Sequence, residues 1–399
     1  MIKKASFFRI ARAILKTPRI VLARPAVNGF LCRYLGKFKI LDVDGNLIIH
    51  SHLPPVNSRA YSRFVTEHLL GESIAPSHAQ IAVTNACPYQ CSYCYNRGRT
   101  GRVMDQQTIL ATVRQLKELG VFWLGLTGGE PLLNRRLEEI IACAAGDCAV
   151  KLFTTGCTLS KQRAEELKQA GLFSVSVSLD HWQEERHDQG RNHSGAFRTA
   201  LEAIEIFRGV AGLHVGVSAV LSAEMLEEEQ IETFLQFLAG LDIHEAWLSE
   251  AKPSTAAYQR PELVVTQEQR ELLIAIQDRY NKKGGMTVNY LGHFEDRRHF
   301  GCSAGHKMIY IDAFGELSPC VFIPMSFGNV RERSVKEIYR TMQQRFPTES
   351  SCFINRNYRL LQGRGSKAGP IDPSAALALL ERIQFSPRSK FFSLHYGNR

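Results

Sequence analysis

From about residue 79 the chain alternates short apolar runs with longer segments in which apolar residues recur at helical spacing. The runs "AQIAVT", "VFWLGLT", "AVKLFTT", "LFSVSVSLD", "LHVGVSAVL" and "EAWLSEA" predict six strands. The intervening segments predict helices over residues 104–119, 134–145, 160–170, 195–208, 227–239 and 266–281. Such a succession of strand–helix units indicates an α/β fold with a parallel sheet and helices outside, either an incomplete barrel or an open sheet.

The segments on either side of this alternation have a different texture. Residues 39–50 predict two short strands around an Asp44–Gly45 turn. After residue 300, "KMIYIDAFGELSPCVFI" predicts a hairpin that turns at Phe314–Gly315, and "SVKEIYRTMQQRF" predicts a helix. The tail after Gly363 is rich in Gly, Ser, Pro and Arg and contains one short apolar helix, "AALALLERI".

We therefore expect five parts in the chain. They are a basic N-terminal segment (1–40), a small β/α unit (41–78), the strand–helix core (79–285), an appended α+β module (286–360) and a C-terminal tail (361–399).

The positive charge of the chain is concentrated at its start. The formal net charge is +10, and residues 1–40 hold ten Lys or Arg and no acidic residue, so the rest of the chain is balanced. A basic footprint for nucleic acid is therefore not expected. In "SFFRIARAILKTPRI", Arg9, Arg12, Lys16 and Arg19 fall at helical spacing, which is typical of a short helix lying on an anionic membrane surface. The alternatives are a basic helix packed on its own domain, a disordered arm and an organelle transit peptide.

Hydropathy and cysteine content bear on the compartment. No run of about 18 apolar residues predicts a membrane-spanning helix, and the N-terminus lacks the features of a secretory signal. Ten cysteines without such a signal are typical of a reducing compartment. We expect a cytoplasmic protein, with the basic segment as the part that would contact a membrane surface.

Three of the cysteines, Cys87, Cys91 and Cys94, directly follow the first predicted strand of the sheet. α/β folds place ligands and reactive groups at the C-terminal ends of parallel strands. A compact loop of this kind suits three thiolate ligands of an iron–sulfur cluster, whereas a structural zinc site normally uses four closed ligands. Three ligands leave one metal position open for an exogenous ligand, as catalytic metal sites require. A zinc-only structural site is the alternative.

This arrangement, with Tyr93 just before the third cysteine, resembles the signature of the radical S-adenosylmethionine (radical SAM) superfamily. The resemblance implies that Cys87, Cys91 and Cys94 hold a 4Fe–4S cluster, which binds S-adenosylmethionine and cleaves it reductively. The product is a 5′-deoxyadenosyl radical that abstracts a hydrogen atom from the substrate. The resemblance also implies a partial (β/α)6 TIM-like barrel and a low-potential electron donor of the flavodoxin or ferredoxin type.

Later strand ends extend the resemblance over about residues 79–285. "TGGEPLL" is similar to the family's GGEP loop, "TTG" to Thr-Asn-Gly, "VSLD" to Ser-Leu-Asp and "HDQGRNHSGAF" to His-Asp-x-x-Arg. The two glycines let the backbone approach a ligand closely, and a carboxylate suits an ammonium group. Thr155 departs from the usual Asn. The resemblance implies cofactor contacts by Gly128, Gly129, Glu130, Thr155, Ser178, Asp180 and Arg191, with Val217–Val220 along the adenine.

A second cysteine group, Cys302, Cys320 and Cys352, lies in the appended module. With the hairpin and the following helix, it resembles the SPASM domain, or the shorter twitch extension, of the same superfamily. The resemblance implies an auxiliary iron–sulfur cluster near the substrate. Three cysteines are fewer than a full SPASM domain carries, which favours one cluster whose fourth ligand is His306, the substrate or a cysteine from the barrel. The alternative is that these residues are buried thiols of a degenerate domain.

The expected function is thus a radical SAM enzyme that modifies a ribosomally synthesised peptide. Whether the outcome is that of an oxidoreductase, a lyase or a transferase stays open. Two other functions stay open as well. One is a membrane-associated enzyme that tailors a lipid or isoprenoid, brought to the membrane by the basic segment. The other is a catalytically silent iron–sulfur or zinc scaffold protein.

Overall fold

The structure is a computed structural model, and it describes residues 3–6, 8–10, 12, 24–71, 75–254, 264–362, 364 and 369–397. Most of the helix predicted in "SFFRIARAILKTPRI" lies outside these residues. In the described part of this segment, β1 (Lys3–Lys4) pairs with β2 (Leu41–Val43), and Arg9 forms an ion pair with Asp42. Lys39 donates hydrogen bonds to the carbonyls of Lys283 (2.9 Å) and Met286 (2.8 Å), just beyond a core helix. No described helix is long and apolar enough to cross a membrane.

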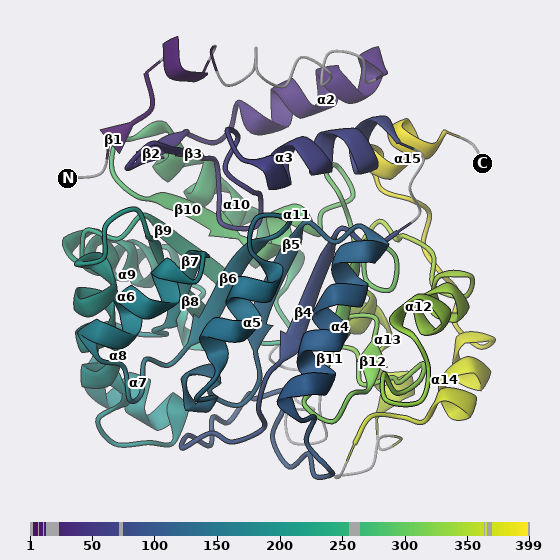
Figure 1. Cartoon of the computed structure of the whole chain (residues 1–399). Helices are drawn as coiled ribbons and strands as arrows, with labels where there is room; N and C mark the ends of the chain where they lie inside the picture. Colours follow the sequence, from purple (N-terminus) through teal and green to yellow (C-terminus); the bar gives the residue numbers. More distant parts are fainter. Residues whose placement is uncertain are drawn as a thin grey trace.

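A nine-stranded sheet occupies the centre of the molecule, with the strand order β10-β9-β8-β7-β6-β5-β4-β11-β12 (Figure 1). Neighbouring strands are parallel except for the antiparallel pair β11 and β12. The bounds are β4 (His78–Ala82), β5 (Trp123–Thr127), β6 (Ala149–Thr154), β7 (Leu172–Ser178), β8 (His214–Leu221), β9 (Glu245–Glu250), β10 (Thr287–Tyr290), β11 (Met308–Ile311) and β12 (Leu317–Ser318). Strands β4 to β9 are the six predicted strands, and the predicted partial (β/α)6 barrel is confirmed.

The sheet extends beyond the six predicted strands on both sides. Strand β10 continues it in parallel beside β9, and β11 pairs in parallel with β4, with Met308 opposite His78. The hairpin from β11 to β12 turns where predicted, and Gly315 in this turn has a φ of +89°. The sheet is therefore continuous across the boundary expected at residue 285, and the appended module shares it with the core.

Helices cover the outer face of the sheet (Figure 1). Strand residues alternate between the two faces. On β7, Val175 and Val177 are fully buried in the main hydrophobic core, whereas Ser178 lines an inner cavity. The helical elements of the core are α4 (Gln106–Leu119), η3 (Pro131–Leu133), α5 (Leu137–Ala144), α6 (Lys161–Gln169), α7 (Glu184–Arg191), α8 (Ala196–Arg208), η4 (Ala223–Met225), α9 (Glu228–Gly240), α10 (Gln267–Lys282) and α11 (Leu291–Phe294).

The N-terminal unit covers the edge of the sheet at which the parallel strands begin. Its elements are α2 (Pro25–Leu35), β2 (Leu41–Val43), β3 (Asn46–Ile48), α3 (Arg59–Arg63) and the π-helix η2 (Phe64–Leu70). The predicted turn at Asp44–Gly45 is present, with φ of +45° and +95°. After β3 the chain enters the barrel. The Ser51 N–H donates to Glu245 Oε1 (3.0 Å), and Trp123 Nε1 donates to the Ser51 carbonyl (2.7 Å).

The C-terminal part packs against both the appended module and the N-terminal unit. Its helices are α12 (Val335–Gln343), α13 (Phe353–Leu361), α14 (Pro373–Leu380) and α15 (Lys390–Tyr396). Helix α15 lies beside α2, and the rings of Phe30 and Phe391 are 5.5 Å apart. The two ends of the described chain therefore share one aromatic cluster, on the side of the molecule opposite the cysteine loop (Figure 1).

Candidate active site

One continuous cavity of about 830 Å³ brings the two cysteine groups together. Eleven of the thirteen predicted site residues line it: Cys87, Cys91, Cys94, Gly128, Gly129, Glu130, Thr155, Ser178, Arg191, Cys302 and Cys320. The other two, Asp180 and Cys352, lie behind the wall and contact the wall residues Arg191 and Lys252. Along β8, Ser218 and Val220 line the same cavity, whereas Val217 and Ala219 are buried in the core.

The two predicted glycines hold the loop after β5 against the cysteine loop. A Cβ on Gly128 would lie 2.2 Å from the carbonyl oxygen of Thr84, and a Cβ on Gly129 would lie 2.2 Å from that of Ala86. The Gly129 N–H donates to the Thr84 carbonyl at 2.8 Å. We predicted that these glycines allow a ligand to approach the backbone closely. In the structure they allow the close approach of the backbone just before Cys87.

Glu130 joins the same loop to the end of β6. Its side chain is fully buried, and its oxygens accept four hydrogen bonds, from Leu132 N (3.0 Å), Thr154 Oγ1 (2.5 Å), Thr155 N (2.6 Å) and Thr155 Oγ1 (2.6 Å). Burial raises the pKa of Glu130, and these donors oppose the rise. Its predicted contact with an ammonium group stays a prediction. In this structure the carboxylate already has a full set of hydrogen-bond donors as partners. Thr155 supplies two of these hydrogen bonds. The threonine that stands where the family usually has Asn therefore still makes a polar contact at the end of β6.

Asp180 and Arg191 form a buried ion pair behind the cysteine loop. Arg191 Nε lies 2.8 Å from Asp180 Oδ2, and its terminal nitrogen donates to Asp180 Oδ1 at 2.9 Å. The Tyr93 hydroxyl donates to Asp180, and so does Val220 N at 2.9 Å. The other terminal nitrogen of Arg191 is 3.9 Å from the sulfur of Cys91. Asp180, predicted on the ribose side of the cofactor, therefore orients Arg191 and Tyr93 in this structure.

The chemistry of the first three thiols fits an iron–sulfur cluster. Burial raises the pKa of Cys87 to about 12 and also raises that of Cys91, which the Arg191 cation partly offsets. Metal binding would therefore release protons from these thiols. In the described part of the chain, no three His, Cys, Asp or Glu side chains have the geometry of a ready-made metal site. The fit rests on three soft donors that come from one loop and line one cavity.

Two members of the second cysteine group, Cys302 and Cys320, line the same cavity. Cys302 precedes β11 and pairs through its backbone with Glu349, which brings the following Cys352 close by. Burial raises the pKa of Cys352 to about 12, and the charges of Glu295 and Cys320 add to this effect. The pKa of Cys302 is raised by burial and by Cys352. Cys302 and Cys320 line one cavity, and Cys352 lies behind its wall beside Lys252.

His306 does not belong to this group, and its prediction as a candidate fourth ligand is not supported. Its ring lies beside Phe392 and Tyr396, and it lines a second cavity together with Phe385 and Arg388. Burial lowers the pKa of His306 to about 3. His306 is close to Cys302 in sequence and directly precedes Lys307 and strand β11. Its ring nevertheless lies in a different cavity from Cys302.

The structure contains a buried charge network at the end of β9 that we did not predict from the sequence. Lys252 forms ion pairs with Glu250 (2.9 Å) and Glu295 (2.7 Å), and Arg270 pairs with Glu250 (2.9 Å). Lys252 Nζ also lies 3.6 Å from the sulfur of Cys352. Lys252, Glu250 and Glu295 all line the main cavity. The available signal was the charged pair in "WLSEAKPS", directly at a C-terminal strand end.

Comparison with known families agrees with this geometry. Residues 81–238 match the model of the radical SAM superfamily, and residues 302–359 match the SPASM model, described as an iron–sulfur cluster-binding domain. The chain belongs to the radical SAM superfamily. It is a radical SAM enzyme with a SPASM domain, and its cofactors are a 4Fe–4S cluster, S-adenosylmethionine and an additional iron–sulfur centre.

Relatives of this radical SAM enzyme have diverse activities. The probable GTP 3′,8-cyclase of Methanosarcina acetivorans is 26% identical over 287 residues, covering 66% of this chain and 83% of that protein. The AdoMet-dependent heme synthase of Methanosarcina barkeri is 26% identical over 293 residues, or 67% and 83% of the two chains. The subtilosin biosynthesis protein AlbA of Bacillus subtilis is 25% identical over 316 residues, or 74% and 66%.

Solved structures share the fold. Streptococcus suis SuiB bound to S-adenosylmethionine aligns with a TM-score of 0.59 and 16% identity, covering 78% of this chain and 81% of that one. The protein anSMEcpe with bound AdoMet aligns with a TM-score of 0.53 and 14% identity, covering 80% and 97%.

Proposed function

We propose that this enzyme abstracts a hydrogen atom from a substrate held in the cavity between its two cysteine groups. The observation that carries the proposal is one cavity whose wall includes Cys87, Cys91 and Cys94 together with Cys302 and Cys320. When bound, the first cluster supplies one electron to S-adenosylmethionine, which yields methionine and a 5′-deoxyadenosyl radical. A protein of the flavodoxin or ferredoxin type supplies that electron.

The residues of the chain have distinct parts in this proposal. Cys87, Cys91 and Cys94 hold the first cluster, and the buried Arg191 places a positive charge beside Cys91. Asp180 keeps that guanidinium in place through its two contacts. In the remaining part of the site, Cys302, Cys320 and Cys352 hold the auxiliary cluster, next to the Lys252 ammonium.

Two substrate classes are supported by different observations. AlbA is named for the biosynthesis of a bacteriocin, and SuiB has been solved with the precursor peptide SuiA, which supports a peptide substrate. The wall of the cavity away from the cysteines is largely aromatic and aliphatic, which supports a lipid or isoprenoid. We favour the apolar substrate, because the cavity of this chain is itself the evidence for it.

The reaction is tested with anaerobically reconstituted enzyme, S-adenosylmethionine and dithionite. We expect 5′-deoxyadenosine from the unaltered enzyme and none from Cys91→Ala. The matched control is Cys32→Ala, which removes an exposed thiol of α2 and should leave the yield unchanged. Absence of 5′-deoxyadenosine from an enzyme with a full iron content would overturn the proposal. Deuterium transfer into 5′-deoxyadenosine from deuterated lipid or peptide then separates the two substrate classes.

A further inference from the structure

The cavity extends far beyond the space between the cysteine groups. Its other end, which we call the apolar arm, is walled by α2, by residues 50–69, by the starts of β4 and β5, and by α15. Side chains that line the arm include Leu31, Leu35, Leu53, Phe64, Phe300 and Phe392. This wall is built from several parts of the chain that are distant in sequence.

The arm and the cysteine loop lie at opposite ends of the parallel strands. His78, the first residue of β4, lines the arm, whereas Cys87 follows the end of the same strand. Five strand residues span about 16 Å at about 3.3 Å each. Gln80, Phe153 and Trp247 line the stretch between the two ends. A ligand that occupies the arm and reaches the thiols must therefore be long.

The charges along the cavity are unevenly distributed. The three carboxylates on its described wall, Glu130, Glu250 and Glu295, belong to the cysteine end. In the arm, burial lowers the pKa of His50 to about 4 and that of His68 to about 3, so both imidazoles are neutral at pH 7. Lys307 also lines the cavity beside His68, and burial lowers the pKa of its ammonium to about 7. A cationic ligand would lose its hydration in the arm without a carboxylate partner to replace it. The arm therefore suits an uncharged, apolar chain.

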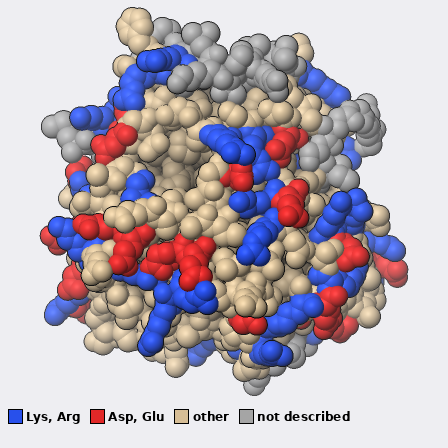
Figure 2. Space-filling model, in the orientation of Figure 1, with Lys and Arg blue, Asp and Glu red and all other residues tan. Residues whose placement is uncertain are grey.

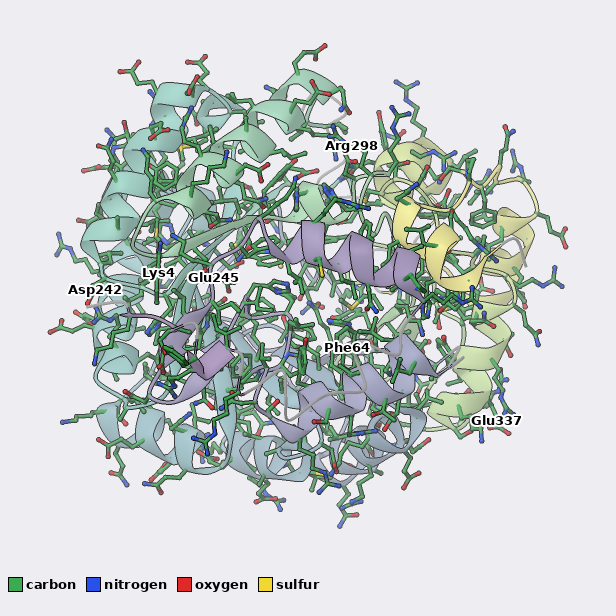
Figure 3. All side chains as sticks on the ribbon, turned by 90° about the horizontal axis from the view of Figure 1, so that it is seen from above. Lys4, Phe64, Asp242, Glu245, Arg298 and Glu337 are labelled. Carbon is green, nitrogen blue, oxygen red and sulfur yellow. The ribbon has the colours of Figure 1, made fainter. Side chains whose placement is uncertain are left out.

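The arm ends beneath α2, which belongs to the most basic part of the sequence. Residues 1–40 hold ten Lys or Arg and no acidic residue, and Arg24 and Arg33 at α2 are exposed. In Figure 3, which looks down on this end, α2 crosses over the molecule and Phe64 lies on the neighbouring helix. Figure 2 shows Lys and Arg side chains bordering this end, with some acidic side chains among them and residues of both signs over the lower half. The exposed Arg24 and Arg33 favour contact with an anionic lipid surface.

We propose that the apolar arm binds the acyl or isoprenoid chain of a membrane lipid, which enters at the α2 and α15 end and extends toward the cysteine groups. The reaction on such a chain rests on the proposed function, whereas the binding does not. The exposed Arg24 and Arg33 would hold this end of the enzyme at the membrane, and the largely aromatic and aliphatic wall would replace the hydrocarbon surroundings of the chain.

Binding is measured with anaerobically reconstituted full-length enzyme. The probe is diphenylhexatriene, whose fluorescence rises in an apolar environment, displaced by geranylgeraniol. Leu35→Trp and Leu53→Trp each fill the arm from a different element, and each should weaken geranylgeraniol binding at least about tenfold. The matched control is Cys32→Trp, on the exposed face of α2, which should bind like the unaltered enzyme. The proposal would be overturned if both filled variants bound geranylgeraniol as tightly as the unaltered enzyme does. It would also be overturned if the unaltered enzyme showed no saturable binding.

Two further measurements keep the test decisive. Circular dichroism reports whether the Trp variants fold. If they do not, a diazirine analogue of geranylgeraniol is cross-linked to the unaltered enzyme, and labelling outside α2, residues 50–69, the starts of β4 and β5, Phe294, Phe300 and α15 would contradict the arm. Formation of 5′-deoxyadenosine without substrate reports the proposed function separately, because it does not require the arm. Deuterium transfer from a peptide, with no geranylgeraniol binding, would assign the cavity to peptide instead.

Discussion

The ammonium nitrogen of Lys252 lies 3.6 Å from the sulfur of Cys352, so the end of strand β9 is directly linked to the SPASM domain. Lys252 is buried and also forms ion pairs with Glu250 and Glu295. Burial alone would lower the pKa of Lys252, but Cys352 and the two carboxylates raise it well above its usual value. The residue is therefore a permanent buried cation beside the proposed auxiliary cluster.

Replacing Lys252 by Met should remove the auxiliary cluster and spare the first one. Without the cation, Glu295 and the thiolate of Cys352 lose their counter-charge, which is electrostatically unfavourable, while Arg270 still pairs with Glu250. We expect the iron and sulfide content to fall to about half, with 5′-deoxyadenosine formation retained. Lys252→Arg is the matched control because it keeps the charge, and it should keep more iron than Lys252→Met. A full iron content in Lys252→Met would contradict the role of this cation.

The Asp180–Arg191 pair should couple the stability of the core to the cysteine loop. Asp180→Asn leaves the buried guanidinium without its counter-charge, so the free energy of unfolding should fall by about 3–5 kcal/mol. Tyr93→Phe removes only one hydrogen bond to Asp180, and its cost should be about 1–3 kcal/mol. Urea unfolding measures both changes.

The double variant Asp180→Asn with Arg191→Met is the control for this pair. It removes both charges, so it should be less destabilised than the sum of the single variants. Strict additivity would show that the two side chains do not interact energetically.

The packing of the glycine loop against the cysteine loop gives a third prediction. Gly129→Ala places a Cβ against the backbone oxygens of Ala86 and Asn85, which cannot move without shifting the cysteine loop. We expect 5′-deoxyadenosine formation to be lost and about half of the iron to be retained, since the SPASM domain is untouched.

Gly190→Ala is the matched control for this substitution. Gly190 lies in α7, and a Cβ there meets no atom within 4 Å. The substitution should leave the iron content unchanged and stabilise the helix by about 0.5–1 kcal/mol. If Gly129→Ala behaves like Gly190→Ala, the close approach of the two loops does not position the cluster.

The strands and the cysteine ligand candidates were accessible from the sequence because each depends on local order. The six predicted strands are short apolar runs with flanking helices, and their polar ends carry Cys87, Glu130 and Asp180. Because parallel strands end at one edge, residues far apart in sequence could be expected to meet there. Eleven of the predicted residues indeed line one cavity.

Partners across the sheet were not accessible in the same way. Nothing in "CSAGHKM" distinguishes Cys302, which lines the main cavity, from His306, which lines another one. The contact of Lys252 with Cys352 joins residues a hundred positions apart, and the sequence contains no signal for it. Likewise, the packing of α15 on α2 depends on aromatic side chains whose partners only the fold defines.

The buried imidazole of His68 predicts how stability depends on pH. His68 is 4% exposed, and its Nε2–H donates to the Gly120 carbonyl at 2.8 Å. Burial and the neighbouring Lys307 lower the pKa of His68 to about 3, compared with about 6.5 in an unfolded chain. Above pH 6.5 neither state binds a proton here. Between about pH 6.5 and 3 only the unfolded state does, so acid lowers the stability of the folded enzyme by about 1.4 kcal/mol per pH unit for this residue.

His68→Gln should remove this contribution while keeping an N–H donor for the Gly120 carbonyl. Between pH 7.5 and 5 its free energy of unfolding should fall by about 2 kcal/mol less than that of the unaltered enzyme. Urea unfolding at several pH values measures the difference. His193→Gln, which changes an exposed imidazole, is the matched control and should follow the unaltered enzyme. If His68→Gln and the unaltered enzyme lose stability equally on acidification, His68 is protonated in the folded state, and the apolar arm is more hydrated than its wall of aromatic side chains indicates.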